Sequence, residues 1–421
     1  MKKTEIKKGI ELSMICDKKF KEFRACVLIH RPLSRGEVTK NSLMTAVMRM
    51  QSGNYPDATA VSTALEELYG ADMTARASKY GEEQIIKVGI QAVSSSVIGK
   101  GDNFGSALYL LFDIAFNAGK NGRFSEQIFE NERENIKNAI LSQQNDKRSY
   151  SVLRLQEEMC KDEPYGVNPI GYTEELAKIS AEGLYSHYQS VLAESRIDII
   201  FTGNFDESEA LEAAALYTKN LSPRDGGITL PVIKSEAGEV KTVTDRMDVT
   251  QGKLCIGFRS TNEMTSETYP AVIVYNTLFG GSATSKLFNN VREKLSLCYY
   301  VNSNIDRLKR IMIVRSGVEF ENFGKAYDEI MFQQQLTENG EFDDAEIGAA
   351  KKQLINAYKS NYDSIGAMGE YNTMQLIMGT DVPISEMIER IQNVTREEIV
   401  SAAKSMKLDT VYMLKSDKEA E

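Results

Sequence analysis

The chain has 421 residues, 42% of them hydrophobic, and its 50 basic and 60 acidic side chains give a net charge of −10. This composition is typical of a globular protein with more than one domain and sizeable apolar cores. No Lys- or Arg-rich block interrupts the mixed charges, so we expect no nucleic-acid partner. The N-terminus lacks the apolar core of a signal peptide and no run is long enough to span a membrane, so we expect a cytoplasmic protein with no membrane partner.

Side chains of the kinds that build zinc sites are scarce. The two histidines are His30 and His187, so a metal site with two histidine ligands would need both. The cysteines are odd in number and lack any C-x-x-C spacing, which favours buried free thiols over disulfides or a cysteine zinc site. They are Cys16, Cys26, Cys160, Cys255 and Cys298.

In chain order, the first half predicts a strand, two helices and a second strand. The extended apolar run at residues 23–32 predicts the first strand. Helices are expected at Asn41–Met50 and at residues 58–70, where Gly70 stops the second. The alternating residues 82–91 predict the next strand.

The second half repeats this order. Its strand, two helices and strand are predicted at residues 253–260, 269–281, 285–296 and 310–319. Each half then closes on a capped helix followed by a strand, within residues 180–205 and 395–416. In the latter, Thr395 and Glu398 fit a capping box.

The repeat predicts the architecture. When Glu67 is aligned with Glu293, the alternating strands come into register. The apolar pairs that then coincide are Ile86 with Met312 and Val88 with Val314. We therefore predict an α+β fold of two tandem homologous domains, each a largely antiparallel sheet with helices packed on one face.

The boundary between the domains is expected near the middle of the chain. Residues 222–245 combine two prolines, three glycines and charge without a long helical period, which is typical of a connector. The predicted division is residues 1–222, a linker at 223–245, and residues 246–421.

A Gly-Gly turn at Gly280 and Gly281 opens the stretch "GGSATSKLFNNVREKLSLCYYV". This is no phosphate loop of the G-x-x-x-x-G-K-[ST] type, because Ser285 precedes Lys286 where that loop needs Gly. Residues 271–279 before the turn are better explained by a helix than by a strand. A corner between two helices already accounts for the glycines.

The same stretch resembles the second domain of the insulinase/pitrilysin family of zinc peptidases, in the bacterial branch related to the mitochondrial processing peptidases. There a Gly-rich turn precedes S-R/K-L-F and R-E-K-x-x-L-x-Y-x-V. The matching residues are Gly280, Gly281, Ser285, Lys286, Leu287, Phe288, Arg292, Glu293, Lys294, Leu297, Tyr299 and Val301. The resemblance spans nearly the whole chain and implies the processing-peptidase fold, of the LuxS/metallohydrolase-like type. Residues 31–71 are similar to Gram-positive members that lack the zinc motif.

The resemblance assigns Arg292 and Tyr299 to substrate binding. In the family these residues project toward a cleft and help to hold the peptide. A guanidinium and a phenol can both donate hydrogen bonds to a carbonyl oxygen that becomes negative during hydrolysis. From this sequence alone, a tyrosine packed on a sheet and a solvated arginine would explain the same pair.

The resemblance also implies that the metal site is degenerate. Active members carry H-x-x-E-H on the first long helix and a further Glu on a later one, for zinc and its water. The corresponding residues here are Thr45, Met48, Arg49 and, at or next to the third ligand position, Ala139. Because none of these is a suitable zinc ligand or base, we expect no metal. An apolar stripe is expected to seat the helix and to leave Thr45, Met48 and Arg49 on the open face; it consists of Leu43, Ala46, Val47 and Met50.

A second departure concerns the strand that pairs with substrate in active members. Its N-A-x-T pattern is replaced by "ADMTARAS", in which Thr74 stands where Asn is expected and Ala75 is retained. Capture of a peptide by this half is therefore in doubt.

Two functions from different classes remain open. The favoured one is a non-catalytic subunit of a heterodimeric zinc peptidase, in which a sister chain supplies H-x-x-E-H and zinc, and this chain supplies Arg292 and Tyr299 for the peptide substrate. The isolated chain is then expected to bind no cofactor and to have no peptidase activity. Self-association is the assembly expected besides the heterodimer. The alternative is a non-proteolytic scaffold or assembly protein of the same fold. An unrelated hydrolase is disfavoured because the sequence has no G-x-S-x-G.

Overall fold

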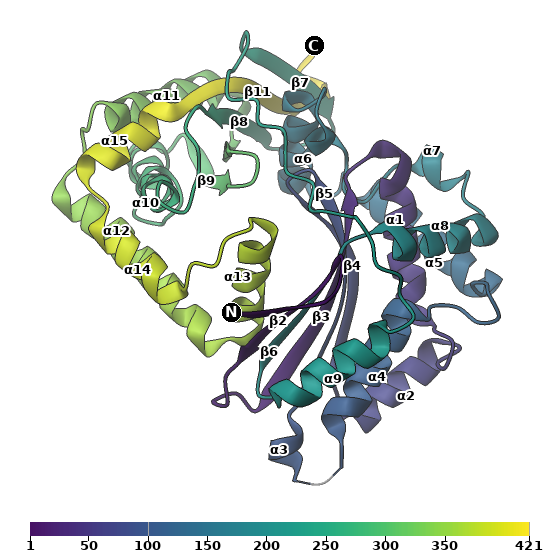
Figure 1. Ribbon diagram of the computed structural model, residues 1–421. Helices are drawn as coiled ribbons and strands as arrows, with labels where there is room; N and C mark the ends of the chain where they lie inside the picture. The colour runs from purple at the N-terminus through teal and green to yellow at the C-terminus, as the bar shows by residue number, and fades with distance from the viewer. Residues whose placement is uncertain (100, 421) are drawn as a thin grey trace. The chain divides into compact units, whose positions relative to one another are not determined.

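A computed structural model describes residues 1–99 and 101–420, which form two compact units (Figure 1). The first unit consists of residues Met1–Leu141, Val167–Leu230 and Asn361–Asp381. The second consists of Ser142–Gly166, Pro231–Ser360 and Val382–Glu421. Each half of the chain therefore contributes one segment to the unit that is built mainly from the other half.

The first unit is built on a six-stranded sheet with the order β1-β2-β6-β3-β5-β4. All neighbouring pairs are antiparallel except β2 and β6, which run parallel. The strands are β1 (Lys2–Lys7), β2 (Ile10–Cys16), β3 (Glu22–Pro32), β4 (Asp72–Tyr80), β5 (Glu83–Val93) and β6 (Ile197–Gly203). The helices are α1 (Arg35–Met50), α2 (Ala58–Glu67), α3 (Ser95–Ile98), α4 (Asn103–Phe116), α5 (Glu126–Ser142, whose last residue falls in the second unit), α7 (Thr173–Leu176), α8 (Ala181–Glu194), α9 (Glu207–Thr218) and α13 (Ile365–Ile377).

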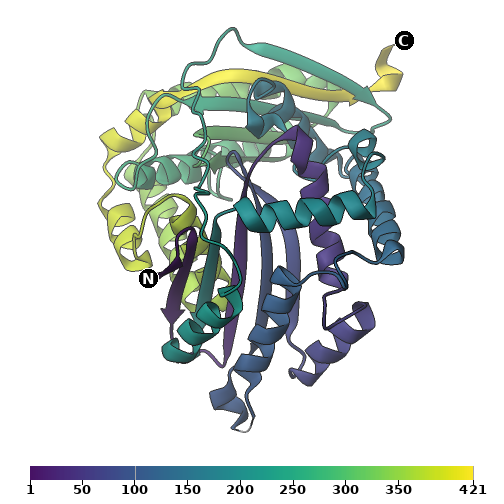
Figure 2. The same cartoon turned by 45° about the vertical axis from the view of Figure 1, so that its right-hand side comes forward.

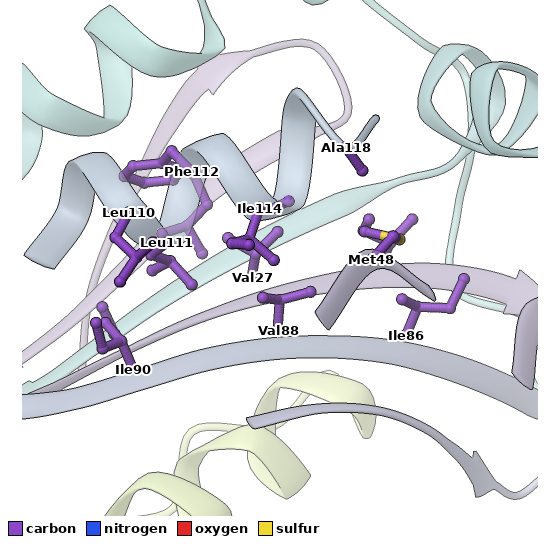
Figure 3. Close-up of a cluster of buried hydrophobic side chains, with 14 of the residues drawn as sticks. Val27, Met48, Ile86, Val88, Ile90, Leu110, Leu111, Phe112, Ile114 and Ala118 are labelled. Carbon is purple, nitrogen blue, oxygen red and sulfur yellow. The ribbon is translucent and has the colours of Figure 1, made fainter. Parts of the chain in front are cut away.

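The core of the first unit lies between the sheet and the helices of the N-terminal half. Alternate residues of β3 and β5, such as Val27 and Val88, point into it and meet Leu111 and Ile114 of α4 (Figure 3). Figure 2 brings this helix-covered face of the sheet toward the viewer. The period-two alternation that predicts the strands therefore selects the side chains that enter the core.

The opposite face of the same sheet is covered by α13. Arg24 of β3 and Lys87 of β5 alternate with the core residues and both contact Glu370 of α13, at 3.2 Å and 2.6 Å. Gly203 at the end of β6 lets α13 approach, because a Cβ there would lie 2.4 Å from Ile365. The sheet thus carries helices on both faces.

The second unit is built on a five-stranded sheet with the order β7-β11-β8-β10-β9. Its strands are antiparallel apart from the parallel pair β7 and β11. They are β7 (Lys241–Met247), β8 (Gly252–Ser260), β9 (Cys298–Asp306), β10 (Ile311–Val318) and β11 (Met406–Ser416). The helices are α6 (Lys147–Met159), α10 (Tyr269–Phe279), α11 (Phe323–Glu338), α12 (Asp344–Ser360), α14 (Ile384–Asn393) and α15 (Arg396–Ser405), and a π-helix spans Leu287–Lys294.

This sheet is also covered on two faces. Leu254 and Ile256 of β8 pack in the main core of the unit, whereas Cys255 between them packs with Leu155 and Met159 of α6. Gly257 makes room for α6, since a Cβ there would lie 2.6 Å from the Met159 sulfur. The segment from the N-terminal half therefore closes the second face.

The predicted fold class is confirmed, with one difference in the layers. Both units are α+β with largely antiparallel sheets, and the capping box of Thr395 and Glu398 is present. The prediction of helices on one face is incomplete, because α13 and α6 cover the second faces. The predicted division at residues 223–245 follows the chain, whereas the compact units exchange these two segments across it. The end of the predicted linker is a strand, since β7 begins at Lys241.

The internal repeat extends to the strand ends. Adding 226 to the residue numbers carries β4, Asp72–Tyr80, onto β9, Cys298–Asp306. Ile86 and Met312, aligned by the same number, are both fully buried in the cores of their own units.

The described helices include none that is both long and apolar enough to cross a membrane.

Candidate functional site

Arg292 and Tyr299 line one hollow of about 410 Å³ in the second unit. Glu293 and Glu319 also line it. The Tyr299 side chain is 57% exposed, and its hydroxyl donates a hydrogen bond to the Glu319 carboxylate. That bond raises the pKa of Tyr299, so the phenol stays protonated. The structure thus brings the two predicted substrate-binding residues together at an accessible surface.

The Arg292 guanidinium borders the hollow and is held by its neighbours on the π-helix. It stacks on the Phe288 ring at 4.8 Å and pairs with Glu293 at 3.4 Å, while 41% of its side chain remains exposed. The stack restricts the direction of the guanidinium and leaves N–H donors free to turn toward a ligand. The arrangement can therefore offer a positive charge beside a phenol.

The helix that carries Arg292 is a π-helix rather than the predicted α-helix. Leu287 and Val291 are fully buried and seat it on the core. Its C-terminus is held by wide turns, with the Leu295 N–H bonded to Asn290 O at 3.1 Å and the Leu297 N–H bonded to Val291 O at 2.9 Å. π-helical turns are rare and are frequent at functional sites. The amphipathic pattern does not distinguish the two kinds of helix.

The Gly-Gly turn before this helix is required by close packing. A Cβ on Gly280 would lie 2.6 Å from the Ser303 hydroxyl, and one on Gly281 would lie 2.8 Å from the Asn276 amide nitrogen. The Gly280 carbonyl accepts from the Ser303 N–H at 3.0 Å, which ties the turn to β9. The turn therefore sets the π-helix against the strand that carries Tyr299, and the predicted helix-to-helix corner is what the structure shows.

Tyr299 and Tyr300 face different surroundings because neighbouring strand residues alternate in direction. Tyr300 is partly buried under the Arg148 guanidinium, which lies 4.2 Å from its ring, and burial raises the pKa of its hydroxyl to about 12. Tyr300 lines a second hollow, of about 320 Å³, which Arg292 also borders. Arg292 thus stands between the two tyrosines, and Tyr299 is the more accessible one.

The helix in the place of the zinc motif does not fit a metal. Thr45 is 1% exposed, and its hydroxyl donates to the Asn41 carbonyl at 2.6 Å. Met48 is fully buried in the apolar core (Figure 3), whereas Arg49 is exposed. Thr45, Met48 and Arg49 therefore do not share an open face, and that expectation is wrong: α1 is buried over a wide arc rather than along one stripe.

The later helix offers no replacement ligand beside α1. Ala139 is half-buried on α5, with no side-chain donor atom. Glu132, about two turns earlier, is buried and accepts a hydrogen bond from the Asn135 amide at 3.1 Å. Among residues 1–99 and 101–420, no three His, Cys, Asp or Glu side chains are placed together to hold a metal ion. The residues at the family's metal position thus do not fit zinc.

Both histidines have structural partners in the first unit. His30 lies between the carboxylates of Glu83 and Asp198, with its ring nitrogens 2.8 Å and 2.9 Å from them. Burial by itself lowers the pKa of His30, but the two carboxylates outweigh it and raise the pKa to about 9. The Nε2–H of His187 donates a hydrogen bond to the side-chain oxygen of Asn41 at 2.7 Å, and burial lowers the pKa of His187 to about 4. The sequence predicts an ordinary partly buried histidine at each position; His30 is fully buried and charged instead.

The edge strand of the first unit keeps an exposed flank. β4 pairs with β5 and ends the sheet order, so its other flank is free for strand addition within the described unit. Thr74, at the position of the family's Asn, is half-buried. The geometry of an edge strand is therefore retained although the family pattern is not.

We expect the purified chain to contain no stoichiometric zinc, and inductively coupled plasma mass spectrometry checks this. The physical reason is that a threonine hydroxyl, a buried thioether and a fixed guanidinium cannot replace two imidazoles and a base. The triple change Thr45→His, Met48→Glu and Arg49→His is a matched test. We expect it to lower stability without restoring zinc, because it buries a carboxylate in an apolar core. One zinc per wild-type chain would contradict the prediction.

We expect the free energy of unfolding to fall as pH rises from 6.5 to 9. The folded-state pKa of His30 is about 9 and lies above its ordinary value of 6.5. The stability that charged His30 contributes is therefore complete below its ordinary pKa and is lost as pH rises through its folded-state pKa. The loss is on the order of 3 kcal/mol. Urea unfolding at several pH values measures the slope. His30→Gln should abolish this pH dependence, whereas His187→Gln should leave it unchanged. An unchanged slope in His30→Gln would refute the assignment of the pH dependence to His30.

Comparison with known proteins identifies the family. Residues 178–354 match the profile described as "Peptidase M16 inactive domain". A Bacillus subtilis protein named "Probable inactive metalloprotease YmfF" is 33% identical over 414 residues, which cover 98% of this chain and 97% of that protein. A Rickettsia felis protein, "Uncharacterized zinc protease", is 25% identical over 321 residues and 72% of each chain. The crystal structure of a conserved protein from Enterococcus faecalis has a TM-score of 0.92 at 29% identity, covering 100% of this chain and 99% of that one.

The chain belongs to the M16 peptidase family, and it is a homologue of the inactive type, without the H-x-x-E-H motif. The resemblance to zinc peptidases of the insulinase/pitrilysin type is thereby confirmed.

Proposed function

We propose that this protein is the non-catalytic subunit of a heterodimeric zinc peptidase. A sister chain with H-x-x-E-H would supply zinc and the general base, and this chain would supply Arg292 and Tyr299 to hold the peptide substrate. The observation that carries the proposal is a contrast within the chain. The residues at the metal position are core or solvated side chains, whereas Arg292 and Tyr299 share an accessible hollow.

The chemistry of the hollow suits a peptide carbonyl. The Arg292 guanidinium can donate to a carbonyl oxygen and stabilise negative charge that develops on it. The Tyr299 proton is donated to Glu319, so the phenol oxygen would accept a peptide N–H rather than donate to a carbonyl oxygen as the sequence suggests. Arg292 would then bind a carbonyl oxygen, and Tyr299 an N–H group, of the same extended peptide.

The Tyr299–Glu319 bond also gives the motif a structural use. It links β9 to the residue that follows β10, and this observation favours the second candidate, a scaffold or assembly protein of the same fold. In a scaffold, removal of the hydroxyl would change stability and leave no activity to lose. The two candidates therefore differ in a measurable way.

Reconstitution tests the proposal. The chain is mixed with an M16 homologue that carries H-x-x-E-H from the same cell, and the mixture is passed over a sizing column and assayed with a quenched peptide library. We expect a one-to-one complex with peptidase activity that neither chain has alone. A complex without activity would support the scaffold, and a self-associated chain that ignores the zinc-bearing homologue would refute the heterodimer.

A further inference from the structure

The first unit contains a hollow of its own, of about 490 Å³, at the C-terminal end of α2 and the start of α4. Its volume lies in the range of small-molecule sites. The side chains that give it chemical character are three tyrosines and two carboxylates: Tyr55, Tyr69, Tyr109, Glu67 and Asp102. None of the predicted roles of the chain uses these residues.

Aromatic faces form the walls of this hollow. The rings of Tyr55 and Tyr109 lie 6.4 Å apart at 64°, so they present two inclined surfaces. Tyr109 also contacts Tyr217, with ring centroids 6.3 Å apart, which supports it from behind. Tyr109 remains 41% exposed and Tyr69 62% exposed. Inclined and accessible π-faces are what an organic cation requires.

The charged side chains on the described lining of the hollow are acidic. Glu67 and Asp102 line it, and its described lining residues include no Lys or Arg. Behind the rings, Asp113 is buried, and its four hydrogen-bond donors, from Ser52, Asn54 and Asn117, are all neutral. The contacts of Asp113 therefore bring no positive charge to this part of the unit.

Tyr69 has an unfavourable backbone conformation, although its side chain is largely exposed. Its φ of 61° lies in the left-handed region, and Gly70 follows with a φ of 74°. A tyrosine in this conformation is unfavourable relative to glycine, and bulky residues adopt it rarely. Because more than half of the Tyr69 side chain is exposed, packing explains little of its presence. Strain of this kind is concentrated at ligand-binding sites.

The internal repeat relates this hollow to the one that holds Arg292 and Tyr299. The number that carries β4 onto β9, 226, also carries Glu67 onto Glu293, and each of the two glutamates lines the hollow of its own unit. Each hollow thus lies where a helix ends before the edge strand of its sheet. The duplicated fold has placed a concave surface at the same point twice, once with an arginine, a tyrosine and two glutamates, and once with three tyrosines and two acids.

We propose that the hollow of Tyr55, Tyr69 and Tyr109 binds an organic ammonium ion. The inclined rings would surround the cation, and Glu67 and Asp102 would neutralise it from the rim. An alkylated ammonium suits such a site because it loses little hydration and offers its charge to every ring. This binding does not depend on the peptidase-subunit role and stands or falls separately.

The matched ligands are choline and its neutral carbon isostere, in which a tert-butyl group replaces the trimethylammonium group. Both are titrated into the full chain and followed by NMR of the methyl groups. Equal shape means that any difference in affinity reports the charge. We expect choline to bind about two- to thirtyfold more tightly, the range of a desolvated cation–π contact. Equal affinities, or no binding of choline, would overturn the proposal.

Variants of Tyr69, with Tyr109→Phe as a control, separate the effect of backbone strain from that of ligand binding. Tyr69→Gly should relieve the left-handed backbone, so the melting temperature should stay the same or rise while choline affinity falls at least threefold. Tyr69→Leu keeps an apolar side chain and removes the π-face, and it should lose affinity as well. Tyr109→Phe keeps the ring and should bind normally. Unchanged affinity in both Tyr69 variants would refute the site.

A lysine side chain on a polypeptide could supply the same ammonium group. A short peptide with one trimethyllysine, and the same peptide with its neutral isostere, form the second arm of the titration. Tighter binding of the trimethyllysine peptide than of choline would assign the site to a polypeptide, and the reverse would assign it to a free amine. In either case Glu67→Gln should lower the affinity for the cation and leave the affinity for the neutral isostere unchanged.

Discussion

Arg292→Ala is expected to lower the peptidase activity of the reconstituted complex by about ten- to a thousandfold, with the complex still assembled. The guanidinium is stacked on Phe288 and half-exposed, so its removal costs little packing. What is lost is a charged donor toward a carbonyl oxygen that becomes negative. The effect should therefore appear in kcat as well as in kcat/KM, and steady-state kinetics on one cleaved peptide measures both.

Two tyrosine variants serve as controls for that result. Tyr299→Phe removes the hydroxyl that faces the hollow and the bond to Glu319, and it should reduce activity in the same direction. Tyr300→Phe removes a hydroxyl on the other side of β9, under Arg148, and should have little effect. A reversed order would move the role to the hollow that Tyr300 and Arg292 share. Full activity in both Arg292→Ala and Tyr299→Phe would make the motif structural.

The sequence predicts well whatever depends on near neighbours in the chain. Alternation in residues 82–91 selects the strand and its core face, because side chains on a strand must point to opposite sides. Thr395 and Glu398 are three residues apart and form their capping box in the structure as expected. Tyr299 is exposed on the edge strand β9, whereas the sequence alone left a tyrosine packed on a sheet as an alternative.

Features that depend on distant segments were not predictable in the same way. Met48 lies on the side of α1 that a single apolar stripe leaves open, yet it is buried, because helices and strands contact α1 from several directions. His30 owes its charge to Glu83 and Asp198, which are far from it in sequence. Nothing near His30 in the chain reveals either carboxylate, and only tertiary packing brings them together.

The exchanged segments illustrate the same limit. α6 and α13 each have an ordinary helical pattern, and the pattern does not say which sheet they cover. The charges that bind them are informative only after the fold is known. Glu370 of α13 meets Lys87 and Arg24 on the first sheet, and Glu163 just after α6 meets Arg259 and Lys309 in the second unit. In both units, a glutamate from the exchanged segment neutralises cations of the sheet or its loops.

Glu163→Gln is expected to lower the free energy of unfolding of the second unit by about 3–5 kcal/mol. The Glu163 carboxylate is buried and accepts from Arg259 and from Lys309, each at 2.7 Å, and both of these cations are themselves buried. Burial would raise the pKa of Glu163, but the two cations outweigh it and hold the pKa below its ordinary value. The carboxylate therefore stabilises the fold above its ordinary pKa, and this contribution is lost as pH falls through the lowered value.

Urea unfolding measures the loss, and hydrogen exchange of the α6 amides shows whether the exchanged segment opens with it. The control is Glu370→Gln, the counterpart in the first unit. Its carboxylate is 39% exposed, so water screens its pairing with Arg24 and Arg76, but Lys87 is 2% exposed and would lose its carboxylate partner; we therefore expect a loss of about 2 kcal/mol, smaller than that of Glu163→Gln. The double variant Glu163→Gln, Lys309→Met should recover part of the stability, because Arg259 still has Asp409 at 2.8 Å. If Glu163→Gln costs no more than Glu370→Gln, the buried cluster does not hold the N-terminal segment on the second sheet.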